Sequence, residues 1–122
     1  MIQHRTILNV ADNTGVKKLQ CIGFIGYSKK RYAEIGEIIV CSVKESLPFS
    51  EIKKGTVVRA LIVRQRKPWR RKDGSYLRFS ENAAVILDKE KNIKGTRIFG
   101  PIPREFKEWG YDDLVSLAPA LV

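Results

Sequence analysis

Seven lysine and arginine side chains stand within sixteen consecutive residues, in the stretch Arg64–Phe79 (RQRKPWRRKDGSYLRF). Asp73 is the one acid among them, so seven cations against one carboxylate give +6, out of +10 for the whole chain. Arginine offers a planar fork of N–H donors to phosphate oxygens, and lysine offers a point charge. Because crowded like charges repel one another until an anion binds, this stretch predicts a polyanionic partner.

Two aromatic residues, Trp69 and Tyr76, stand between these cations, as stacking on splayed RNA bases requires. Trp69 follows Pro68, so packing of its ring on the barrel is an equal alternative to stacking on a base, and contact with a neighbouring protein is a third. Two smaller basic clusters lie in other loops, and solubility alone would explain an isolated lysine pair. The predicted RNA-binding residues are Lys29, Lys30, Arg31, Lys53, Lys54, Arg64, Arg66, Lys67, Trp69, Arg70, Arg71, Lys72 and Arg78.

Short β-branched runs separated by turn residues must hold these loops, and their regular spacing predicts an all-β barrel or sandwich. In residues 37–43, Ile39, Cys41 and Val43 fall on one face, the period of two that a half-buried strand requires. Residues 57–64 are almost continuously apolar, which predicts a central strand. The basic stretch itself has the pattern of a hairpin, with its turn at residues 72–75, so two strands would carry the charge outward.

Helical signals occur only near the end of the sequence. Residues 103–109 have proline in a first helical turn, and Gly110 follows as a stop signal. Residues 112–118 begin with two aspartates and precede Pro119, which predicts a second short helix. Residues 105–122 hold four carboxylates against one lysine, a net charge of −3, so the tail is opposite in sign to the basic stretch.

Enzyme, metal and membrane functions find little support. The sequence has no phosphate-cradling glycine motif, no paired carboxylates in an apolar setting and one histidine, His4, so we expect no catalysis and no cofactor or metal. Cys21 and Cys41 lie in apolar strand-like contexts and are predicted to be buried, reduced thiols. No apolar run reaches the roughly 18 residues that span a bilayer, and no signal or transit peptide is recognisable at the start, so we expect no membrane partner.

Several motifs resemble those of one known family. Ala60–Val63, then Asp73-Gly74 after nine residues, then Phe79, Asn82 and Val85-Ile86, are similar to the signature of the universal large-subunit ribosomal protein L-fourteen family. The likeness runs from end to end and is closest to the bacterial and organellar branch. It is carried by LNVADNTG at 8–15, Arg31-Tyr32-Ala33 with Gly36, Val43-Lys44-Glu45, GTRIFGPIPRE at 95–105 and SLAP at 116–119.

The resemblance implies one domain over residues 1–122. It would be mainly β: a small closed five-stranded β-barrel over about residues 1–100, a projecting basic ribbon over about 64–79, and short C-terminal helices over about 101–122. It also implies binding to large-subunit rRNA beside ribosomal proteins L-three and L-nineteen, and contact with small-subunit rRNA in an intersubunit bridge. A ribosome silencing factor would dock on a face that includes Thr96, Arg97 and Ser116.

The implied location is the ribosome of a bacterial cytoplasm, a mitochondrial matrix or a plastid stroma. Two stretches depart from the family pattern. Residues 64–72 are more basic than usual and contain Trp69. Residues 108–113 replace a commonly basic stretch with a largely acidic one, which removes the basis for RNA contact there and leaves contact with a neighbouring protein as an alternative. A free-standing RNA-binding regulator is the rival function, and a nuclease is disfavoured by the missing acid–base groups.

Overall fold

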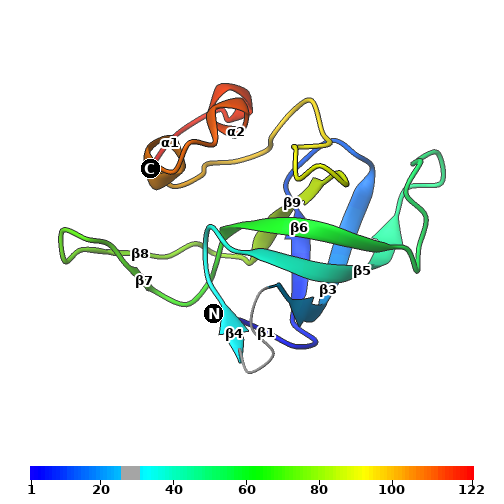
Figure 1. Ribbon diagram of the computed structural model, residues 1–122, viewed down its shortest axis with the longest axis horizontal. Helices are drawn as coiled ribbons and strands as arrows, with labels where there is room; N and C mark the ends of the chain where they lie inside the picture. Colours follow the sequence, from blue (N-terminus) through cyan, green and yellow to red (C-terminus); the bar gives the residue numbers. More distant parts are fainter. Residues whose placement is uncertain (26–30) are drawn as a thin grey trace.

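The fold is a closed β-barrel with a ribbon and a helical tail attached at one end (Figure 1). The computed structural model describes residues 1–25 and 31–122. Five strands close the barrel in the order β2-β3-β5-β6-β9; β2 and β9 pair in parallel and the other neighbours are antiparallel. The predicted mainly β, five-stranded barrel with short helices is thereby confirmed. The strands are β2 (Ile7–Val10), β3 (Val16–Phe24), β5 (Ile38–Ser46), β6 (Val57–Arg64) and β9 (Ala83–Leu87).

Strand patterning places the core as the sequence predicts. In β5 the side chains of Ile39, Cys41 and Val43 are fully buried, whereas Lys44 faces solvent. Strand β6 pairs with β5 on one side and β9 on the other, and Ala60–Arg64 at its end are buried without alternation. A strand covered on both faces loses its period of two, so the nearly continuous apolar run of β6 is explained by its central place.

Two smaller two-stranded sheets flank the barrel. Strand β1 (Ile2–Gln3) pairs with β4 (Tyr32–Ala33). Each of these strands has only two residues, which is too short to show a strand pattern in the sequence. Strand β7 (Trp69–Arg70) pairs with β8 (Tyr76–Leu77), and this ribbon projects away from the barrel (Figure 1). The predicted projecting hairpin is confirmed, with residues 71–75 as its turn.

The helical tail packs at the ribbon end of the barrel (Figure 1). It consists of α1 (Glu105–Glu108) and α2 (Asp112–Leu117), close to the two predicted helices. Phe106 from α1 and Leu114 from α2 are fully buried and belong to the same apolar cluster as the barrel interior. Within the described residues, none of the helices has the length and apolar character needed to cross a bilayer.

The two cysteines are part of the barrel interior. Cys21 in β3 and Cys41 in β5 are register partners, yet both are free thiols and both are buried. Burial raises the pKa of both thiols, which disfavours the thiolate that metal binding or nucleophilic attack would need. The prediction that they act as small apolar side chains is confirmed.

Candidate nucleic-acid interface

Five cations of the ribbon remain exposed to solvent. They are Arg66, Lys67, Arg70, Lys72 and Arg78. The only acid among them, Asp73, accepts hydrogen bonds from the Ser75 backbone N–H at 2.9 Å and from the Ser75 hydroxyl at 2.6 Å. These bonds, with help from nearby Arg104, hold the pKa of Asp73 below its usual value. The carboxylate is therefore committed to the turn, and the ribbon as a whole keeps a cationic surface.

Arg64 does not belong to that surface. Its side chain is buried, with 6% of the residue exposed, and all its described partners lie within the chain. The guanidinium Nη1 donates to the backbone oxygens of Phe99 at 2.9 Å and Pro101 at 3.1 Å, and Nη2 lies 2.9 Å from Glu81 Oε1. We therefore remove Arg64 from the predicted RNA-binding set, because its donors tie the end of β6 to the segment that leads into the helical tail.

Gly100 makes room for this arginine. Its φ of +81° lies in the left-handed region, and a Cβ atom there would stand 2.6 Å from Arg64 Nη1. Any other residue would meet both backbone strain and a clash with the guanidinium. Gly100, the second glycine of the GTRIFG motif, is thus explained by a buried arginine thirty-six positions earlier in the chain.

Arg71 is the second predicted RNA-binding cation that the fold uses internally. Its Nε lies 3.0 Å from Glu105 Oε2, and the two side chains are only 11% and 14% exposed. Arg71 Nη2 also donates to the backbone oxygen of Val122. The ion pair lacks hydrogen-bond geometry at Nε, so it holds the ribbon to the tail mainly through charge. This is where the opposite charges of the two segments meet, and we likewise remove Arg71 from the set.

The aromatic residue in question, Trp69, packs against the tail. Its ring meets that of Trp109 edge-on, with centroids 5.8 Å apart, and Trp109 in turn meets Phe106 at 5.2 Å. A Cβ on Gly36 would stand 2.6 Å from the Trp109 ring, so that ring also lies against the strand connection before β5. Of the alternatives open for Trp69, packing within the chain is the one that the structure supports, although its ring partner is Trp109 of the tail and not a side chain of the barrel. Two departures from the family pattern in the sequence, Trp69 and residues 108–113, are thus in contact with each other through Trp69 and Trp109. We call this cluster of Trp69, Arg71, Glu105, Phe106 and Trp109 the ribbon–tail contact.

The other basic clusters lie away from the ribbon. Arg31, Lys53 and Lys54 are exposed, and Lys53 Nζ donates to the Pro48 backbone oxygen at 2.8 Å. The connection between β5 and β6, which carries the two lysines, extends from the opposite end of the barrel (Figure 1). Lys29 and Lys30 lie outside the described residues. The predicted cations are therefore spread over separate surfaces, and the ribbon holds the densest group.

The predicted subunit-interface residues are exposed on two segments. Asn13 organises the first: its Oδ1 accepts from the backbone N–H of Thr96 at 2.9 Å and of Arg97 at 3.2 Å, and its Nδ2 donates to Thr96 Oγ1 at 2.9 Å. The Arg97 guanidinium lies 5.5 Å from the centre of the Phe99 ring. Ser116, on α2, donates its hydroxyl to the Asp113 backbone oxygen at 2.8 Å. No hydrogen bond or ion pair among the described residues joins Ser116 to the other two.

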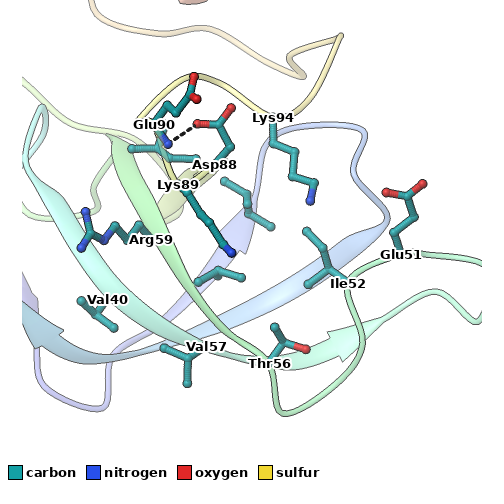
Figure 2. Close-up of a pocket in the computed structure, with 13 residues that line it drawn as sticks. Val40, Glu51, Ile52, Thr56, Val57, Arg59, Asp88, Lys89, Glu90 and Lys94 are labelled. Carbon is teal, nitrogen blue, oxygen red and sulfur yellow. Dashed lines mark hydrogen bonds between the residues drawn. The ribbon is translucent and has the colours of Figure 1, made fainter.

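A broad groove of about 1000 Å³ crosses the barrel surface over β5, β6 and β9, but it lacks the charge for RNA (Figure 2). Its floor is apolar, and its rim balances three cations against three carboxylates: Arg59, Lys89, Lys94, Glu51, Asp88 and Glu90. A phosphate would meet no net attraction there. In the described part of the chain, no three His, Cys, Asp or Glu residues gather closely enough to hold a metal ion.

These features define a class of protein: a small β-barrel that carries an exposed cationic ribbon braced by its own C-terminal tail. The comparison with family models identifies the family. The model described as Ribosomal protein L14p/L23e matches residues 1–122, the full length of the sequence, and the chain belongs to this family. It is accordingly a structural protein of the large ribosomal subunit.

Proposed function

We propose that this protein binds large-subunit rRNA through the exposed cations of its ribbon. The observation that carries the proposal is the sorting of charge: the five exposed cations project from the barrel, while the ribbon's carboxylate and two further arginines are used within the fold. A projecting ribbon enters spaces between RNA helices that a flat surface cannot reach. Arg31, Lys53 and Lys54 supply further phosphate contacts on other surfaces, as do Lys29 and Lys30.

The exposed Thr96, Arg97 and Ser116 form, in this proposal, the face toward the small subunit. Arg97 contributes to an intersubunit bridge with small-subunit rRNA, and the same face accepts a ribosome silencing factor. Ribosomal proteins L-three and L-nineteen are the proposed neighbours within the large subunit, in a bacterial or organellar ribosome. A free-standing regulator is not favoured, because the model of a ribosomal protein family matches residues 1–122.

Removing three ribbon cations should weaken RNA binding and leave the fold intact. We expect the variant Arg66→Ala, Arg70→Ala, Arg78→Ala to bind large-subunit rRNA fragments more weakly, with a salt dependence of log K less steep by about 2–3. Each phosphate contact releases counterions from the RNA when it forms. A variant with fewer contacts releases fewer counterions, so its binding constant depends less steeply on salt. Filter binding between about 50 and 200 mM salt measures the affinity and its salt dependence. The free energy of unfolding, measured by thermal denaturation, should change by less than about 0.5 kcal/mol per site.

The matched control removes three exposed lysines from the barrel strands, as Lys17→Ala, Lys18→Ala, Lys44→Ala. It makes the same change in net charge at a place the proposal does not use. Equal losses in the two variants would show that RNA responds to overall charge and not to the ribbon, and would contradict the proposal.

Reversing the charge at Arg97 tests the subunit face. We expect large subunits carrying Arg97→Glu to associate with small subunits roughly tenfold more weakly, because a carboxylate would face phosphate where a guanidinium stood. Light scattering or sedimentation of mixed subunits measures the association. Lys89→Glu is the control, since it reverses an exposed charge on the groove rim. Association unchanged by Arg97→Glu would rule out a bridge role for this residue.

A further inference from the structure

The ribbon has two unlike faces, which the pairing register defines. Trp69 stands opposite Leu77, and Arg70 stands opposite Tyr76. Successive residues of a strand point to opposite faces, and directly paired residues point to the same one. One face therefore carries Trp69 and Leu77, and we call it the inner face. The other carries Arg70 and Tyr76.

Burial follows this alternation along both strands. On the inner face, Trp69 and Leu77 are half-buried, and Arg71, the next residue of that parity, makes the ion pair with Glu105. Arg70, Tyr76 and Arg78 are all exposed, Tyr76 to 68%. Strand β8 ends at Leu77, and the alternation of burial continues past it: Leu77 is half-buried, Arg78 is exposed and Phe79 is half-buried, so Arg78 falls on the side of Tyr76. We call the surface of Arg70, Tyr76 and Arg78 the outer face.

The composition of the outer face fits a nucleotide better than a duplex backbone. A tyrosine ring is flanked by two guanidinium groups: Arg70 directly across the ribbon, within roughly 5.5 Å at Cβ, and Arg78 two residues along. Stacking on an aromatic ring requires an open base face, which the interior of a duplex does not offer. The two guanidinium groups supply the charge-assisted donors that phosphates on either side of such a base would accept.

The outer face is also held in place before any ligand arrives. The inner face is fixed to the tail by the Trp69–Trp109 contact and by the Arg71 ion pair, and the Asp73 carboxylate lies 3.7 Å from Arg104. A site on a braced element loses less conformational entropy on binding than one on a free loop. Trp69 cannot serve in its place, because its ring packs against Trp109 on the inner face.

We propose that the outer face binds one unpaired RNA nucleotide, with its base stacked on Tyr76 and its flanking phosphates on Arg70 and Arg78. This inference rests on the proposed rRNA binding and sharpens it: duplex RNA contacts the ribbon through charge alone, and an unpaired base adds the stacking contact. Tyr76 thus becomes the residue that distinguishes one RNA form from another.

The test compares two synthetic RNAs, a fully paired duplex and the same duplex with one unpaired purine in its centre. We expect the full chain to bind the bulged RNA at least roughly fivefold more tightly at about 100 mM salt, from a stacking contribution of about 1 kcal/mol or more. Tyr76→Leu should abolish this preference and leave duplex affinity unchanged, whereas Tyr76→Phe should keep it. Phe49→Leu is the control, because Phe49 is another exposed aromatic residue, 81% accessible, outside the ribbon.

The outcomes separate the two proposals. Binding of both RNAs with equal affinity, or a preference that survives Tyr76→Leu, would overturn the stacking inference and leave rRNA binding standing; the outer face would then be a protein-contact surface. Failure of the wild-type chain to bind either RNA even at about 50 mM salt would overturn the proposed rRNA binding itself. Circular dichroism of each variant checks the fold, which substitution of an exposed side chain should not disturb.

Discussion

Phe106→Ala is expected to release the ribbon from the tail while the barrel stays folded. Phe106 is fully buried and contacts both Trp109 and Tyr111 edge-on, at 5.2 and 5.5 Å between centroids. Truncating a buried phenylalanine costs about 3–5 kcal/mol, from lost burial and the cavity left behind. Because the tail is two short helices attached at one end of the barrel, this loss falls first on the ribbon–tail contact and not on the five-stranded sheet.

Tryptophan fluorescence measures this contact selectively. The chain has two tryptophans, Trp69 and Trp109, and each is the other's ring neighbour. We expect the midpoint of their thermal transition to fall by on the order of 10–20 °C in Phe106→Ala, with a smaller shift in the far-ultraviolet signal of the barrel. The RNA consequence follows: a ribbon without its brace should lose the preference for an unpaired base, since Tyr76 would no longer be held in place.

Phe49→Ala provides the matched comparison. It removes the same atoms from a side chain that is 81% exposed, so its stability should change by less than about 0.5 kcal/mol. Similar effects from the two substitutions, or tryptophan emission unaltered by Phe106→Ala, would show that the tail does not depend on Phe106.

The strands were predictable because their signals are local. A period of two placed the β5 core residues, and the even burial of β6 at Ala60–Arg64 follows from the apolar run that the sequence displays. Helix boundaries followed from a proline and Gly110, whose φ of +85° suits a stop. The β1–β4 pair was not predicted, since two-residue strands carry no periodicity.

The functional sorting of the arginines was not predictable from composition, because a guanidinium looks the same in sequence whether it binds phosphate or carbonyl groups. Arg64 and Arg71 acquire internal partners from residues that are distant in the chain, Phe99 and Glu105 among them. One signal could have separated Arg64: it ends a strand covered on both faces, where a side chain has little access to solvent. The inner and outer faces of the ribbon likewise depended on register, which sequence alone leaves open by one residue.

Arg64→Met should therefore lower the stability of the fold, whereas Arg66→Met should weaken RNA binding, although the two residues are only two positions apart. Loss of the Arg64 guanidinium leaves the Phe99 and Pro101 carbonyls without donors and Glu81 without its partner, so we expect the free energy of unfolding to fall by about 2–4 kcal/mol. This loss is smaller than that for breaking a fully buried ion pair, because the Glu81 side chain is 40% exposed and solvent screens its charge.

Arg66 is exposed, and its described hydrogen bond is made by its backbone N–H to Asn82 Oδ1, which the substitution keeps. Arg66→Met should leave stability within about 0.5 kcal/mol and make the salt dependence of RNA binding less steep by about one. Chemical denaturation measures the first quantity and filter binding at several salt concentrations the second. Folded Arg64→Met should bind RNA as the wild type does, because the guanidinium that it loses contacts groups of the protein itself and not the RNA-binding surface. A stable Arg64→Met variant with weakened RNA binding would place this side chain on the RNA surface, and would reverse the division of the ribbon's cations argued from burial.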